Sequence, residues 1–105
     1  MIERDIDALI DEELESFTYA HTVDVKCFKD HRIKPRTIRL CMDFDGVEWK
    51  DCYLLTDHND IDDSPYRAAF DPEYGKFVRE ITLEDGTPHY LGRYPNLESL
   101  VDDFA

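Results

Sequence analysis

The sequence is poor in glycine, in paired cysteines and in long hydrophobic runs, and each shortage excludes a class of protein. It has only four glycines and no glycine-rich phosphate loop. Its three cysteines, Cys27, Cys41 and Cys52, form no CxxC pair, so we expect buried thiols rather than disulfides or a zinc knuckle. No run approaches the roughly 18 apolar residues of a membrane span. The N-terminal residues carry acids where a signal peptide carries bases. We therefore expect a soluble, cytoplasmic protein, in the host cell if a phage encodes it.

Basic side chains are scarce as well. Twelve Lys and Arg stand against 25 Asp and Glu, a formal net charge of −13 at pH 7. Such a charge repels nucleic acids and anionic membranes and attracts basic protein surfaces, which argues against direct binding of nucleic acid or membrane. With 105 residues, 42% of them hydrophobic, the chain is long and apolar enough for one compact domain over residues 1–105.

Hydrophobic spacing predicts the order of the helices and strands. Apolar residues recur every three or four positions in residues 2–17, which predicts an amphipathic helix, and alternate in residues 18–29, which predicts a strand. Two hairpins follow, with strands at 36–44 and 47–56 around Asp45-Gly46, and at 76–83 and 88–94 around a turn that also contains Asp-Gly. Ser64-Pro65 predicts the start of a short helix between the hairpins, and Asn96 predicts the cap of a C-terminal helix.

These elements predict an α+β fold, an antiparallel sheet of about five strands with the N- and C-terminal helices packed on one face. In the first hairpin, Phe44 would face Val47, Met42 would face Trp49 and Ile38 would face Tyr53, all on one apolar side. The same register places Asp51 opposite Leu40, as the one acid on that side. In the second hairpin Ile81 would lie opposite Tyr90, and Pro88 would place its strand at an edge of the sheet.

The stretch DHNDIDDSPY, residues 57–66, is the one candidate for a cation site. Asp60, Asp62 and Asp71 fit positions one, three and twelve of a calcium loop, but Pro65 stands where such a loop needs glycine. An acidic approach to a helix start explains Asp62 and Asp63 better. No nucleophile motif or metal-ligand spacing is present, so we expect no cofactor and no catalytic residue.

Charge is unevenly divided along the chain. Residues 26–39 hold six of the twelve bases and one acid, a local charge of +5 that leaves −18 on the other residues. We predict that this segment forms the turn between the first two strands, with Lys29, Arg32, Lys34 and Arg36 at one end of the sheet. This basic tip would contact a phosphate or an acidic partner, or would only solubilise the turn.

The acids themselves are the strongest functional signal. They gather in the first helix, the central loop and the last helix, and the candidate partner-binding residues are Glu3, Asp5, Asp7, Asp11, Glu12, Glu13, Glu15, Asp57, Asp60, Asp62, Asp63, Glu98, Asp102 and Asp103. DNA carries one charge per roughly 1.7 Å of axis, a density that an acidic protein surface can approach. In size and charge alone, the chain is similar to small acidic inhibitors of phages and mobile elements. Some of those are anti-restriction and anti-CRISPR proteins that occupy the nucleic-acid channel of a nuclease.

We therefore expect a non-enzymatic binding protein that inhibits or masks a basic, nucleic-acid-handling partner such as a nuclease complex. Two other functions stay open. One is a small metal-dependent, carboxylate-based enzyme. The other is an accessory or structural subunit that acts through an uncovered face of its sheet. The sequence does not predict the oligomeric state.

Overall fold

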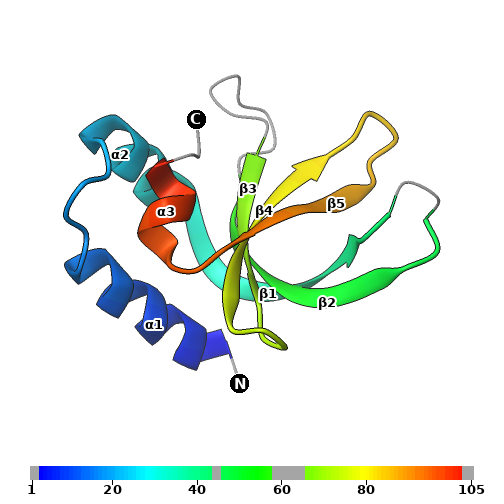
Figure 1. Cartoon of the computed structure of the whole chain (residues 1–105), viewed down its shortest axis with the longest axis horizontal. Helices are drawn as coiled ribbons and strands as arrows, with labels where there is room; N and C mark the ends of the chain where they lie inside the picture. The colour runs from blue at the N-terminus through cyan, green and yellow to red at the C-terminus, as the bar shows by residue number, and fades with distance from the viewer. Residues whose placement is uncertain (1–2, 44–45, 58–65, 103–105) are drawn as a thin grey trace.

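The computed structural model describes residues 3–43, 46–57 and 66–102, and within them it contains three helices and five strands. Figure 1 shows the helices gathered on one side and two long hairpins extending from the other. The elements in chain order are α1 (Glu3–Glu15), α2 (Thr22–His31), β1 (Arg32–Cys41), β2 (Trp49–Thr56), β3 (Tyr66–Asp71), β4 (Lys76–Thr82), β5 (Pro88–Tyr94) and α3 (Leu97–Asp102). The α+β class is confirmed.

The sheet is a closed barrel, so the expectation of a plain antiparallel sheet is wrong. Consecutive strands pair antiparallel from β1 to β5, and β1 then meets β5 in parallel at Cys41 and His89. Strand twist accumulates across a sheet and bulges bend it, so the outer strands can meet. Pro88 therefore does not mark an open edge. It is the first residue of β5, a position where a missing N–H is tolerated.

Residues 22–31 form a helix, α2, where the alternation of valines predicts a strand. The buried side of the element contains Phe28, with Val25 and Cys27 packed against the same core, while Val23 is 76% exposed. Residues three apart lie on one side of a helix, so the alternation from Val23 to Cys27 is coincidental.

The segment after Pro65 is a strand, β3, and not the short helix that its alanines favour. All six of its residues pair with β4, and Tyr53 and Leu54 of β2 pair with Phe70 and Ala69 on its other side. Pairing on both sides outweighs local propensity in a central strand. Ser64 and Pro65, the predicted helix start, lie outside the described residues.

The first hairpin is paired one residue away from the predicted register. Cys41 lies opposite Trp49 and Ile38 opposite Cys52. The side chain of Asp43 explains the shift, because its Oδ1 accepts hydrogen bonds from the N–H groups of Val47 at 3.0 Å and Glu48 at 3.5 Å. These bonds stabilise a loop longer than the expected two residues. Phe44 lies outside the described residues.

The second hairpin follows the predicted register only at the start of β4, where Arg79 lies opposite Gly92. An irregularity follows, and Glu80 then pairs with Tyr90 and Ile81 with His89. The extra residue on β5 is Leu91, as in a β-bulge. A one-residue slip moves side chains to the other face of a strand, so the first hairpin buries residues other than those expected.

The strands bury residues on both faces. One core cluster joins the helices to the sheet and consists of Ile6, Ile10, Phe28, Leu55, Ala68, Phe70, Phe77, Leu97, Leu100 and Val101. The second cluster consists of Leu40, Cys52, Ala69 and Val78. Successive residues of a strand point to opposite faces, so these residues lie on the face opposite to the strand residues of the first cluster. The helices therefore cover one side of the barrel and leave the hairpin ends uncovered (Figure 1).

Candidate functional site

Helix α1 presents an acidic stripe to solvent. Asp5, Glu12 and Glu15 are exposed, and Ile6 and Ile10 of the same helix are fully buried. Spacings of seven and three residues place the three acids on one side of the helix, over roughly 15 Å at 1.5 Å per residue. Within the described part of the chain, no ion pair engages Glu12 or Glu15. Glu3 is the first residue of the helix.

Three other acids predicted to bind a partner hold the fold together. Arg32 forms ion pairs with Asp7 at 2.8 Å and Asp11 at 2.7 Å, which join α1 to the start of β1. Glu13 Oε1 accepts the N–H of Leu97 at 2.9 Å, at the first residue of α3. These carboxylates have partners within the chain, so they contribute less to the negative surface potential than the sequence suggests.

Glu98 has an internal role. Its side chain is buried, with 7% exposure, and its Oε2 accepts the N–H groups of Thr18, Tyr19 and Ala20 at 2.6–2.8 Å. Burial alone would raise the pKa of the Glu98 carboxyl, but these donors outweigh it and lower the pKa. Glu98 therefore does not belong to the exposed acidic surface. Asp102 on α3 is exposed, and Asp103 lies outside the described residues.

The basic segment is not a turn between two strands. It forms the C-terminal part of α2 and most of β1, where Lys29 and Lys34 are exposed. Arg36 pairs with Asp57 at 3.0 Å, and Arg67 approaches the same carboxylate at 3.4 Å. The Asp57 side chain is only 18% exposed, so this acid and Arg36 largely neutralise each other.

Asp71 is unsuited to the calcium loop that the sequence allows. It is fully buried, and its Oδ2 accepts the hydroxyl of Tyr90 at 2.7 Å. Its Oδ1 accepts the N–H of Glu73 at 3.0 Å and lies 3.4 Å from Lys50 Nζ. Asp60 and Asp62, its proposed co-ligands, lie outside the described residues.

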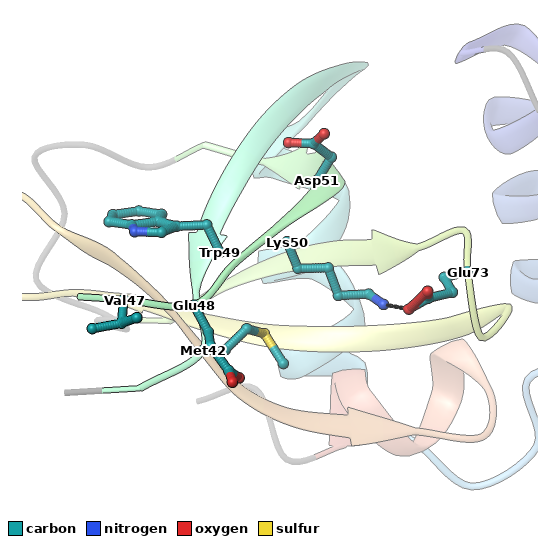
Figure 2. A pocket seen from close by; sticks show the side chains of 7 residues that line it. All are labelled: Met42, Val47, Glu48, Trp49, Lys50, Asp51 and Glu73. Atoms are coloured by element: carbon teal, nitrogen blue, oxygen red, sulfur yellow. Dashed lines mark hydrogen bonds and ion pairs between the residues drawn. The ribbon is translucent and has the colours of Figure 1, made fainter. Parts of the chain in front are cut away.

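The ammonium of Lys50 occupies the place where two carboxylates converge, because it pairs with both Asp71 and Glu73. Figure 2 shows Lys50 reaching toward Glu73. Among the described residues, no group of three or more His, Cys, Asp or Glu could hold a metal ion. Burial raises the pKa of the nearby Cys52 thiol to about 12, and burial together with Asp71 raises that of Tyr90 above its ordinary value. These shifts keep both groups protonated and unreactive at neutral pH.

Asp51, expected on the apolar side opposite Leu40, is instead an exposed partner of Arg39. The two lie opposite each other in β1 and β2, with Asp51 Oδ1 at 3.3 Å from Arg39 Nε and the Asp51 side chain 78% exposed. The one-residue shift of the hairpin accounts for the difference. Asp51 is thus no candidate for a buried catalytic acid.

The uncovered ends of the hairpins expose large apolar side chains, and those on the first hairpin were expected on its apolar side. Val47 is 75%, Trp49 42% and Met42 38% exposed on the first hairpin. Leu91 is 46% and Leu83 38% exposed on the second. Trp49 points away from Lys50 and Glu73 (Figure 2), and its indole Nε1 donates to the carbonyl of Gly46 at 3.0 Å. The helices lie at the other side of the barrel, so no element covers these residues within the described chain.

A hollow of about 700 Å³ lies between the two hairpins. Met42 and Asp43 line it from the first hairpin, and Ile81, Leu83, His89, Tyr90 and Leu91 line it from the second. A shallower depression of about 570 Å³, shown in Figure 2, begins at Met42 and continues over Val47 and Trp49. Sequence reasoning missed this region. The sequence shows only the acidic character of its surroundings, since both hairpin turns contain acids and no Lys or Arg.

Comparison of the chain with protein-family models, with curated proteins and with solved structures found no match. None of the helices within the described residues is long and apolar enough to cross a membrane.

Proposed function

We propose that the protein is a small acidic binding protein, without catalytic activity of its own, that masks or inhibits a basic, nucleic-acid-handling partner. An anti-CRISPR or anti-restriction type of nucleic-acid mimic is the form of this function that suits its charge. The observation that carries the proposal is the solvent-facing stripe of Asp5, Glu12 and Glu15 on α1.

The internal ion pairs concentrate the charge surplus in a few surface positions. Six of the twelve bases pair with carboxylates within the described residues: Lys26, Arg32, Arg36, Arg39, Lys50 and Arg67. The exposed acids that no such pair engages are Glu12, Glu15, Glu48, Glu84, Asp85 and Asp102. They lie on α1, on both hairpins and on α3, and their negative potential would steer a basic surface toward the protein.

A groove built for DNA or RNA is lined with Lys and Arg that neutralise phosphates. Carboxylates on a rigid helix can replace those phosphates without the cost of ordering a flexible chain. Binding of this kind weakens as salt rises, because the attraction is screened.

The test begins with capture of the partner. Tagged protein is incubated with lysate of the source cell at low salt, washed with rising salt, and the eluted proteins are identified by mass spectrometry. We expect a basic nuclease or other nucleic-acid-binding protein that elutes as salt rises. If nothing basic is retained at low salt, the charge serves solubility and the proposal fails.

Charge reversal then locates the contact. Glu12→Lys with Glu15→Lys should weaken binding of the captured partner at low salt by roughly tenfold or more. Asp24→Lys with Asp30→Lys on α2 is the matched control, because it changes the net charge equally on another helix. Equal affinity of the α1 variant and the unchanged protein would exclude the stripe as the contact.

A second candidate function, an accessory subunit that acts through its sheet, is supported by exposed Met42, Val47 and Trp49. Large contiguous patches of exposed apolar side chains are rare on monomeric proteins, and those that occur often mark interaction surfaces. Sedimentation analysis separates the two functions, because a stable homodimer that buries this surface favours the accessory subunit.

A further inference from the structure

The hollow between the hairpins results from the way the barrel closes. Among the described residues, β1 and β5 meet at one residue pair, Cys41 and His89. Beyond that pair the two hairpins diverge, as Figure 1 shows on the side away from the helices. We call the space between them, lined by Met42, Asp43, Ile81, Leu83, His89, Tyr90 and Leu91, the hairpin groove.

The hairpin groove is lined mainly by apolar and aromatic side chains and has the size of a recognition site. Its volume of about 700 Å³ falls within the roughly 300–1,000 Å³ of ligand sites. Leu83, Leu91 and Met42 keep 38–46% of their surface exposed there. Tyr90 is fixed by its hydrogen bond to buried Asp71, so one wall is preorganised. A partner side chain that fills the groove would displace water from several apolar residues at little cost in ordering.

The charge around the hairpin groove has one sign. Among the described residues, 42–43 and 46–49 contain Asp43 and Glu48, residues 81–91 contain Glu84 and Asp85, and none of these segments contains Lys or Arg. Glu48, Glu84 and Asp85 are exposed. An apolar peptide with acidic flanks would be repelled here, whereas one with basic flanks would meet a complementary rim.

We infer that the hairpin groove is a docking site for a protein segment that presents one or two large apolar side chains flanked by Lys or Arg. This inference rests on the proposed function in one respect, the basic character of the partner. It adds a second contact of different chemistry. Burial of the apolar side chains supplies affinity, and the acidic residues around the groove favour segments whose flanking residues are basic.

Blocked synthetic peptides test the inference without the natural partner. The probe peptide carries leucine and tryptophan between pairs of arginines. One control peptide replaces leucine and tryptophan with serines, and the other replaces the arginines with glutamines. Each is titrated into isotope-labelled full-length protein while amide shifts are followed by NMR. We expect the probe to shift Met42, Leu83, His89 and Leu91 and to bind at least about tenfold more tightly than either control.

Substitutions in the protein give an independent readout. Leu83→Ser with Leu91→Ser should weaken binding of the probe by about tenfold or more. Tyr19→Ser with Val23→Ser is the matched control, because these side chains are 56% and 76% exposed outside the groove. If the groove variant fails to fold, the shift map of the unchanged protein still decides the question.

The outcomes separate this inference from the proposed function. If the serine peptide binds as tightly as the probe and shifts α1, the groove inference is overturned and the acidic surface stands. If the glutamine peptide binds the groove as tightly as the probe, the basic requirement is wrong here and the proposed function loses support. Groove shifts that change on dilution without any peptide would identify a second copy of the chain as the occupant, which also overturns the inference.

Discussion

At the scale of single residues, the structure assigns different roles to acids that look alike in the sequence. Glu12 and Glu98 both lie in acidic helices, yet Glu12 is exposed and Glu98 is buried against three backbone N–H groups. Those donors belong to residues about eighty positions away in the chain. The sequence could show that the chain is acidic, but not which carboxylates the fold uses, because the partners are set by tertiary contacts.

Replacement of Glu98 by glutamine tests its role in joining α3 to the segment before α2. An amide oxygen accepts hydrogen bonds without a charge, so Glu98→Gln should lower the melting temperature at neutral pH. The pKa of Glu98 in the folded chain lies below its ordinary value of 4.5. The carboxylate therefore stabilises the fold above about pH 4.5, and this contribution is lost as the pH falls through the folded pKa. Thermal unfolding of both proteins across this range measures the difference.

The pH dependence distinguishes this role from a simple packing effect. The two melting temperatures should converge as the pH falls through the lowered pKa of Glu98 in the folded chain, where the carboxylate becomes protonated. Glu12→Gln is the matched control and should change the melting temperature little at any pH, because Glu12 is exposed. A deficit of Glu98→Gln that is the same at neutral and acidic pH would contradict the charged role.

At the scale of elements, local signals succeed where packing agrees with them. The apolar spacing of residues 2–17 predicts α1, and the Asn96 cap predicts α3; both are confirmed. Alternation correctly predicts the main parts of β1, β2, β4 and β5. It fails for α2, where a chance alternation of valines overlies a helical face, and for β3, where two neighbouring strands override the alanines. Both failures come from contacts beyond the local segment.

The cap of α3 provides a test at this scale. Asn96 Oδ1 accepts the N–H of Ser99 at 2.8 Å, and α3 has only six described residues, so its start matters for its stability. Asn96→Ala should lower the free energy of unfolding by about 0.5–2 kcal/mol, measured by urea denaturation. Asn96→Asp keeps an acceptor at the cap and should retain most of the stability. Equal loss in both variants would show that the side-chain oxygen is not what stabilises this end.

At the scale of the whole molecule, closure of the barrel and the open groove could not be predicted from the sequence. The seam between Cys41 and His89 joins residues that no local pattern connects. The groove exists because the hairpins extend past that seam while α1, α2 and α3 pack on the other side (Figure 1). The two strands of the first hairpin were predicted correctly, but their expected pairing was one residue off and therefore placed Met42 and Trp49 on an apolar side where the structure exposes them.

The net charge makes the stability of the whole molecule depend on salt. A formal charge of −13 is confined to a body of 38 × 32 × 21 Å. The screening length is roughly 30 Å at 0.01 M salt, comparable with these dimensions, and about 10 Å at 0.1 M. Repulsion between distant acids is thus screened over this range, whereas paired groups in contact, such as Arg67 and Glu80 at 2.9 Å, are affected less.

We therefore expect the free energy of unfolding to rise as sodium chloride increases from about 0.01 to about 0.1 M, measured by urea denaturation at each concentration. Glu12→Gln with Glu15→Gln should stabilise the protein at low salt, and this advantage should shrink as salt rises, because the removed repulsion is then already screened. A protein that loses stability over the same range would show that its contact ion pairs outweigh the long-range repulsion. The acidic surface would then carry no stability cost of its own, and the case that it is retained for a basic partner would weaken.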